Sequence, residues 1–185
     1  IDMGNVCFKL FDYETALELY KKVFVLNPDN KIVAICIGNT LTLMKEKQKA
    51  YSYFEKALKM DGDNYKAYIC YAIALSEFGE YDMAVAMYEK AEAIHPKEIE
   101  AQILRANLYT NFNFLDQAMD LYKQVLRIKP NNARTYMLLG NAHYLKGEIE
   151  QSIAAYRASI NIERENDEYR LICTQILDEY IDKKR

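Results

Sequence analysis

A spacing of 34 residues recurs from one end of the chain to the other. A small residue is followed four positions later by an aromatic residue, and this pair returns five times at that spacing. The pairs are Ala16–Tyr20, Ala50–Phe54, Ala84–Tyr88, Ala118–Tyr122 and Ser152–Tyr156. A fixed period of this length is the sequence signature of a repeat protein, in which each repeat packs only against its neighbours.

Each repeat contains two apolar-periodic segments separated by a short break. Over residues 133–164 the break falls at Lys146-Gly147, and the second segment carries Ile153 and Tyr156. Apolar residues three and four positions apart form one face of an α-helix. The repeat is therefore predicted to be a helix, a tight turn and a second helix that runs back along the first.

Proline and glycine mark the ends of the repeats, because proline has no amide hydrogen and disfavours helix in the residue before it. Eight positions after the aromatic residues stand Pro28, Gly62, Pro96, Pro130 and Arg164. These stops predict an array over residues 1–166 with repeats 1–30, 31–64, 65–98, 99–132 and 133–166. The stretch 167–185 has one apolar and one polar face, which predicts a helix that caps the C-terminal end of the array.

The turn inside each repeat is expected to need a residue that tolerates positive φ. Gly79, Asn113 and Gly147 meet that need, whereas Phe11 and Lys45 occupy the same position in the first two repeats. Two alternatives follow for these two turns. Either their shape differs from that of the others, or Phe11 and Lys45 hold a strained backbone.

These residues resemble the tetratricopeptide repeat, whose pattern runs from an aromatic residue through Leu-Gly, Tyr, Ala and Phe or Tyr to Pro. The resemblance extends over essentially the whole chain. It implies an all-α fold, a right-handed α-α superhelix or solenoid of about five helix-turn-helix repeats. The first helices would line a concave groove and the second helices would form its outer wall. It also implies a non-catalytic scaffold or adaptor that binds other proteins.

A row of asparagines is expected to face this groove. Asn5, Asn39, Asn107 and Asn141 occupy one equivalent position, which Ile73 interrupts. A side-chain amide both donates and accepts hydrogen bonds, so a row of amides can pair with the backbone of an extended peptide. Asparagine is also common at this place in generic members of the family, and a purely structural role stays open.

The floor of the groove is predicted to be apolar. Its residues are Ile35, Cys36, Ile69, Cys70, Ile73, Ile103, Leu104, Met137 and Leu138. Exposed apolar patches mark binding surfaces, and this one favours an apolar or amphipathic segment of a partner protein. The alternatives are that the superhelix closes over these residues or that another part of the chain fills the groove. An acidic tail is disfavoured, since carboxylates need convergent cations and the basic groove residues Lys66 and Arg134 are two repeats apart.

Several other classes of function are disfavoured. A net charge of −3 argues against nucleic acid as a partner. No apolar run approaches the roughly 20 residues of a membrane span. No catalytic or metal-binding motif is present, so no cofactor is expected; His95 precedes Pro96, and His143 is predicted to be a packed core histidine.

The cysteines and the start of the chain lead to three further expectations. Cys7, Cys36, Cys70 and Cys173 form no CxxC pair and are expected to be reduced thiols, which favours the cytoplasm. The chain begins inside a helical pattern at Ile1. That start suggests an alternative function as the regulatory or targeting array of a larger enzyme, and it leaves self-association through the open N-terminal face as a further hypothesis.

Overall fold

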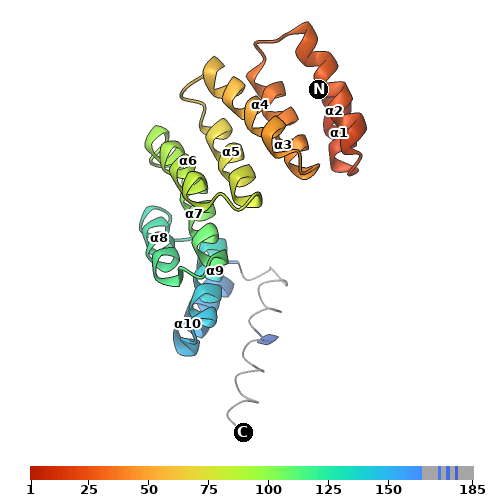
Figure 1. Cartoon of the computed structure of the whole chain (residues 1–185). Coiled ribbons are helices and arrows are strands. Elements are labelled where there is room, and N and C mark those ends of the chain that lie inside the picture. The colour runs from red at the N-terminus through yellow and green to blue at the C-terminus, as the bar shows by residue number, and fades with distance from the viewer. Residues whose placement is uncertain (164–170, 172–173, 176–177, 179–185) are drawn as a thin grey trace. The chain divides into compact units, whose positions relative to one another are not determined.

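The computed structural model describes residues 1–163 together with Leu171, Thr174, Gln175 and Asp178, and the capping helix predicted over 167–185 falls almost wholly outside them. The regular structure of the described residues is helical (Figure 1). The helices are α1 (Asp2–Lys9), α2 (Tyr13–Leu26), α3 (Lys31–Leu43), α4 (Lys47–Met60), α5 (Tyr65–Glu77), α6 (Tyr81–Ile94), α7 (Glu100–Asn111), α8 (Leu115–Ile128), α9 (Ala133–Leu145) and α10 (Ile149–Ile162).

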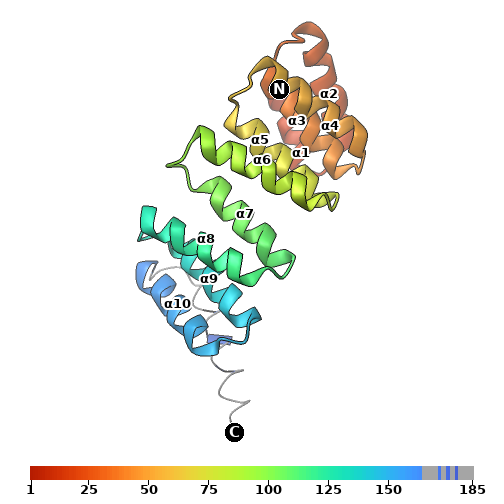
Figure 2. The same ribbon diagram turned by 60° about the vertical axis from the view of Figure 1, so that its left-hand side comes forward.

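The chain divides into an N-terminal half, Ile1–Pro96, and a C-terminal half, Lys97–Arg185. Within the N-terminal half, α1 pairs with α2, α3 with α4 and α5 with α6, while α2 also packs against α3 and α4 against α5 (Figure 2). Within the C-terminal half, α7 pairs with α8 and α9 with α10, and α8 packs against α9. The predicted all-α solenoid of stacked helix-turn-helix repeats is thus confirmed within each half.

Glycines allow the two helices of a repeat to approach closely. A Cβ atom on Gly4 would lie 2.6 Å from a ring carbon of Tyr20, and one on Gly38 would lie 2.8 Å from the ring of Phe54. These distances are far shorter than a normal van der Waals contact. The aromatic residue of the second helix therefore lies directly against the backbone of the first helix.

All five turns inside the repeats share one backbone shape. Their φ angles are 63° at Phe11, 61° at Lys45, 76° at Gly79, 63° at Asn113 and 81° at Gly147. Of the two alternatives for Phe11 and Lys45, the structure supports strain and not a different turn. A side chain in this region costs about 1 kcal/mol relative to glycine. The packing of the two flanking helices evidently outweighs that cost.

Gly62 occupies the position that Pro28 has in the first repeat, and we predict that proline is tolerated there. Asp61 has φ −149° and ψ 96°, which is the extended conformation required before proline. Gly62 does not use a positive φ. Gly62→Pro should raise the free energy of unfolding by about 0.4–1 kcal/mol, because it restricts the unfolded chain. Chemical denaturation measures the change.

A matched control for this prediction is Gly79→Pro. Gly79 has φ +76°, which the proline ring cannot adopt, so this variant should be less stable than the unsubstituted protein. Equal changes in the free energy of unfolding for the two variants would contradict the prediction that the backbone at Gly62 accommodates proline.

Candidate binding surface

Three of the four asparagines in the row are hydrogen bonded inside their own repeat. In each case the hydroxyl of the seam tyrosine, fifteen residues later, donates to the side-chain carbonyl oxygen. The distances are 2.7 Å from Tyr20 to Asn5, 2.6 Å from Tyr122 to Asn107 and 2.5 Å from Tyr156 to Asn141. The amide oxygen of these residues thus joins the two helices of its repeat. The structural role left open by the sequence is present in these three repeats.

The second repeat departs from this arrangement because Phe54 stands in place of the tyrosine and has no hydroxyl. The Phe54 ring still lies against Gly38, as the tyrosine rings lie against the equivalent glycines. Asn39 instead directs Nδ2 toward Sγ of Cys70 in the next repeat, at 3.6 Å. Within the described part of the chain, no donor reaches the Oδ1 atom of Asn39.

The third repeat has the complementary substitution. Ile73 replaces the asparagine and is 40% exposed, while Tyr88 keeps the hydroxyl and is 3% exposed. Burial, with a smaller contribution from Cys70, raises the pKa of Tyr88 far above its usual range. The Tyr88 phenol is therefore neutral at physiological pH, and Ile73 presents an apolar side chain where the other repeats present an amide.

A hollow of about 250 Å³ lies on the first-helix side of the N-terminal half, beside α1, α3 and α5. Its lining is mainly apolar. The lining residues are Phe8, Asn39, Thr42, Leu43, Cys70, Ile73, Ala74 and Glu77. Leu43 and Ile73 are 43% and 40% exposed, so solvent reaches the hollow.

The hollow gathers Asn39, Cys70 and Ile73, which were predicted for the groove, together with Thr42, which lies on the same face of α3 as Asn39. Sequence reasoning missed four others: Phe8, Leu43, Ala74 and Glu77. These four lie in the last turns of the first helices. The signal would have been position along the helix, because Phe8, Leu43 and Glu77 lie three or four residues beyond the recurring asparagine position, and side chains at that spacing share a helix face.

The remaining predicted groove residues differ in how much surface they offer. Ile69 and Ile103 are only 5% and 6% exposed, so they belong to the packing between helices and offer little to a partner. Ile103 and Leu138 pack together with Ile99 and Val125. Ile35, Cys36, Leu104 and Met137 are half-buried. Part of the predicted apolar floor is thus buried by the fold, whereas the hollow keeps apolar surface open at Leu43 and Ile73.

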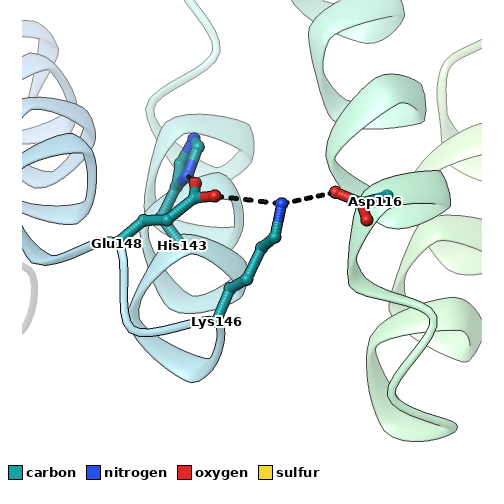
Figure 3. A network of polar contacts seen from close by, with 4 residues as sticks. All are labelled: Asp116, His143, Lys146 and Glu148. Atoms are coloured by element: carbon teal, nitrogen blue, oxygen red, sulfur yellow. Dashed lines mark hydrogen bonds and ion pairs between the residues drawn. The ribbon is translucent and has the colours of Figure 1, made fainter.

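A polar network closes the last hairpin (Figure 3). His143 Nδ1 lies 2.6 Å from a carboxylate oxygen of Glu148, whose other oxygen lies 2.9 Å from Nζ of Lys146. Lys146 also contacts Asp116 of α8 at 2.6 Å. Lys146, and then His143, lower the pKa of Glu148 below its usual value. His143 is 8% exposed, so the predicted packed histidine is confirmed, with a carboxylate partner that the sequence did not reveal.

Among the described residues, no group of three or more histidine, cysteine or acidic side chains is placed to hold a metal ion. No helix in that same part of the chain is long and apolar enough to cross a membrane.

The stacked hairpins and their aromatic–glycine seams define a helical repeat protein of the solenoid class. The sequence matches the tetratricopeptide repeat over residues 41–108 and 133–166, and a further TPR repeat over residues 113–147. The chain belongs to the tetratricopeptide repeat family. Proteins of this family bind other proteins or peptides, so membership supports a protein-interaction scaffold in general terms. No curated protein matches the sequence.

Solved structures share the fold at low sequence identity. A crystal structure of MamA is 22% identical with a TM-score of 0.71, covering 91% of this chain and 99% of that one. YrrB, described as a TPR protein with an unusual peptide-binding site, is 20% identical with a TM-score of 0.65, covering 95% and 90%. PilF of Pseudomonas aeruginosa is 16% identical with a TM-score of 0.75, covering 99% and 83%.

Proposed function

We propose that this protein is a non-catalytic scaffold or adaptor that captures an apolar or amphipathic segment of a partner protein on its first-helix surface. The observation that carries the proposal is the open apolar hollow beside α1, α3 and α5. A folded protein gains stability by burying such surface, so apolar side chains that stay exposed in a concave place are typical of a binding site. The peptide-binding site named for YrrB supports the same proposal by analogy of fold.

The size of the hollow favours a peptide segment over a small-molecule ligand. Pockets for small molecules and cofactors usually measure about 300–1,000 Å³ and enclose most of the ligand. The hollow here measures about 250 Å³ and is open to solvent. It suits one large apolar side chain that projects from a longer chain lying across the surface.

A reducing compartment such as the cytoplasm is proposed for this scaffold on the pattern of its cysteines, which form no CxxC pair. None of Cys7, Cys36 and Cys70 is in a disulfide. Thiols persist in reducing compartments such as the cytoplasm, whereas the cysteines of extracellular proteins tend to form disulfides. Burial, followed by the neighbouring Cys70, raises the pKa of Cys36, which keeps that thiol protonated and unreactive.

A selection from random peptides displayed on phage, with the whole chain as bait, tests the proposal. Peptides that are enriched should contain apolar residues, and a labelled synthetic copy should bind the chain in solution. Ile73→Glu places a charge in the hollow and should weaken that binding at least tenfold, because an unpaired charge against apolar surface is costly.

The matched control is Val25→Glu, since Val25 is also an exposed apolar residue but lies on the second helix α2. This variant should bind like the unsubstituted chain, and both variants should keep their helical circular dichroism. A selection that enriches no peptide, or equal losses in the two variants, would refute the proposed first-helix surface.

A further inference from the structure

Asn39 differs from the other asparagines of its row in having an unused acceptor. Asn5, Asn107 and Asn141 each accept a tyrosine hydroxyl on Oδ1. Asn39 makes its one hydrogen bond through Nδ2 and, within the described residues, receives none on Oδ1. It is also the member of the row that lines the hollow. The polar atom best able to accept a hydrogen bond from a guest therefore stands beside the open apolar surface.

The cause of this difference is a single missing oxygen. The Phe54 ring faces Gly38 with the same carbons that Tyr20 and Tyr156 turn toward Gly4 and Gly140. A Cβ atom placed on Gly38, Gly4 or Gly140 would lie 2.8, 2.6 or 2.9 Å from the nearest of these carbons. A hydroxyl on Phe54 would therefore reach Asn39 as it does in those repeats. Its absence leaves the Asn39 carbonyl oxygen available.

The charged side chain that lines the hollow is acidic. Glu77 is the charged residue of its lining, and it is the last residue of α5. Leu43, another lining residue, is the last of α3. Helix C-termini carry a partial negative charge, so they attract cations. Lys45 contacts Glu77 at 3.2 Å, but both side chains are more than half exposed, and such a pair contributes little. A cation of a guest can therefore take its place.

We infer that the hollow recognises an extended segment of a partner protein in which a large apolar side chain stands next to a lysine or arginine. The apolar side chain enters the space between Phe8, Leu43 and Ile73. A backbone N–H of the segment donates to Asn39 Oδ1, and the cation lies near Glu77. This inference rests on the proposed function and adds the class of segment and the residue that reads its backbone.

Phe54→Tyr tests this assignment without removing any lining residue. The new hydroxyl should donate to Asn39 Oδ1 and so compete with the guest. The probe is a labelled synthetic peptide copied from the phage selection on the whole chain. Loss of one backbone hydrogen bond should weaken its binding about fivefold to tenfold. Asn39→Leu removes the same acceptor directly and should give a similar loss of peptide affinity. It serves as the test if Phe54→Tyr fails to fold.

Two controls separate recognition from general effects. Tyr122→Phe removes a hydroxyl from the C-terminal half, which contributes no residue to the lining of the hollow, and should leave peptide binding unchanged. Replacing the lysine or arginine of the peptide by glutamine should weaken binding to the unsubstituted chain. The same change in the peptide should weaken binding to the Glu77→Gln variant less, because that variant lacks the carboxylate.

The outcomes distinguish this inference from the proposed function. Enriched peptides that pair apolar residues with acidic ones, or that bind Phe54→Tyr and Asn39→Leu as tightly as the unsubstituted chain, would overturn the inference while peptide capture stands. A selection that enriches no peptide at all would overturn both. Basic–apolar peptides that lose affinity in both variants would support it.

Discussion

Tyr122→Ala is expected to lower the free energy of unfolding by about 4 kcal/mol, because it removes a fully buried aromatic ring and leaves a cavity. Tyr122 is 1% exposed and belongs to a core cluster with Ala106, Ala118 and Leu139. Its hydroxyl donates to Asn107 at 2.6 Å. Denaturation in guanidinium chloride, followed by circular dichroism, measures the loss.

Tyr122→Phe separates the contribution of the ring to stability from that of the hydroxyl. It keeps the ring and removes the hydrogen bond, so it should cost only about 1 kcal/mol. Asn107→Ala should give a similar loss, and the double variant should lose little more than either, because the two groups interact with each other. Losses that simply add would show that the tyrosine–asparagine hydrogen bond contributes no stability. Burial raises the pKa of Tyr122 to about 12, so its hydroxyl remains a donor at any physiological pH.

The helical hairpins could be predicted from the sequence because their signals are local. The 3.6-residue periodicity, the stops at Pro28, Pro96 and Pro130, and the small residues at the helix crossings each act within one repeat or between its two helices. The turns at Phe11 and Lys45 could not be settled in this way. Their backbone shape is imposed by the packing of the helices on either side, which overrides the local preference of those residues.

The role of the asparagines is an example of what the sequence left undecided. Asparagine can bind a peptide backbone or hold a neighbouring helix, and the choice depends on whether a hydroxyl lies within reach. Whether a hydroxyl lies close enough depends on how the two helices pack against each other. The sequence does contain a trace of it, since Asn5, Asn107 and Asn141 are each followed fifteen residues later by tyrosine, whereas Asn39 is followed by Phe54. Read together, those two positions separate the structural asparagines from the one that lines the hollow.

The hollow itself was only partly predicted, and the reason is geometric. Predicted groove residues came from the middle of each first helix, where the repeat pattern is strongest. Phe8, Leu43 and Glu77 come from the helix ends, where the residue type changes from repeat to repeat although the position on the helix face recurs. Their contribution depends on how successive first helices are staggered, which is set by tertiary packing.

Gly140→Leu is the second large effect expected, with a loss of about 3 kcal/mol in the free energy of unfolding. Gly140 lies in the middle of α9, and a Cβ atom there would be 2.9 Å from the ring of Tyr156. Tyr156 is 2% exposed, so its ring has no open space into which to move. A leucine must therefore push α9 and α10 apart or force side chains out of their preferred rotamers.

A cycle of variants tests whether the ring of Tyr156 is the obstacle. Gly140→Ala should be far milder, because alanine favours helix over glycine by about 1 kcal/mol, which offsets part of the clash. Ala106 occupies the equivalent position in the fourth repeat, where the fold accommodates a Cβ. In the double variant Gly140→Leu/Tyr156→Ala, leucine can fill the space that the ring leaves. Its loss should then be smaller than the sum of the two single losses. A loss equal to that sum would mean that something other than the Tyr156 ring limits the approach of the two helices.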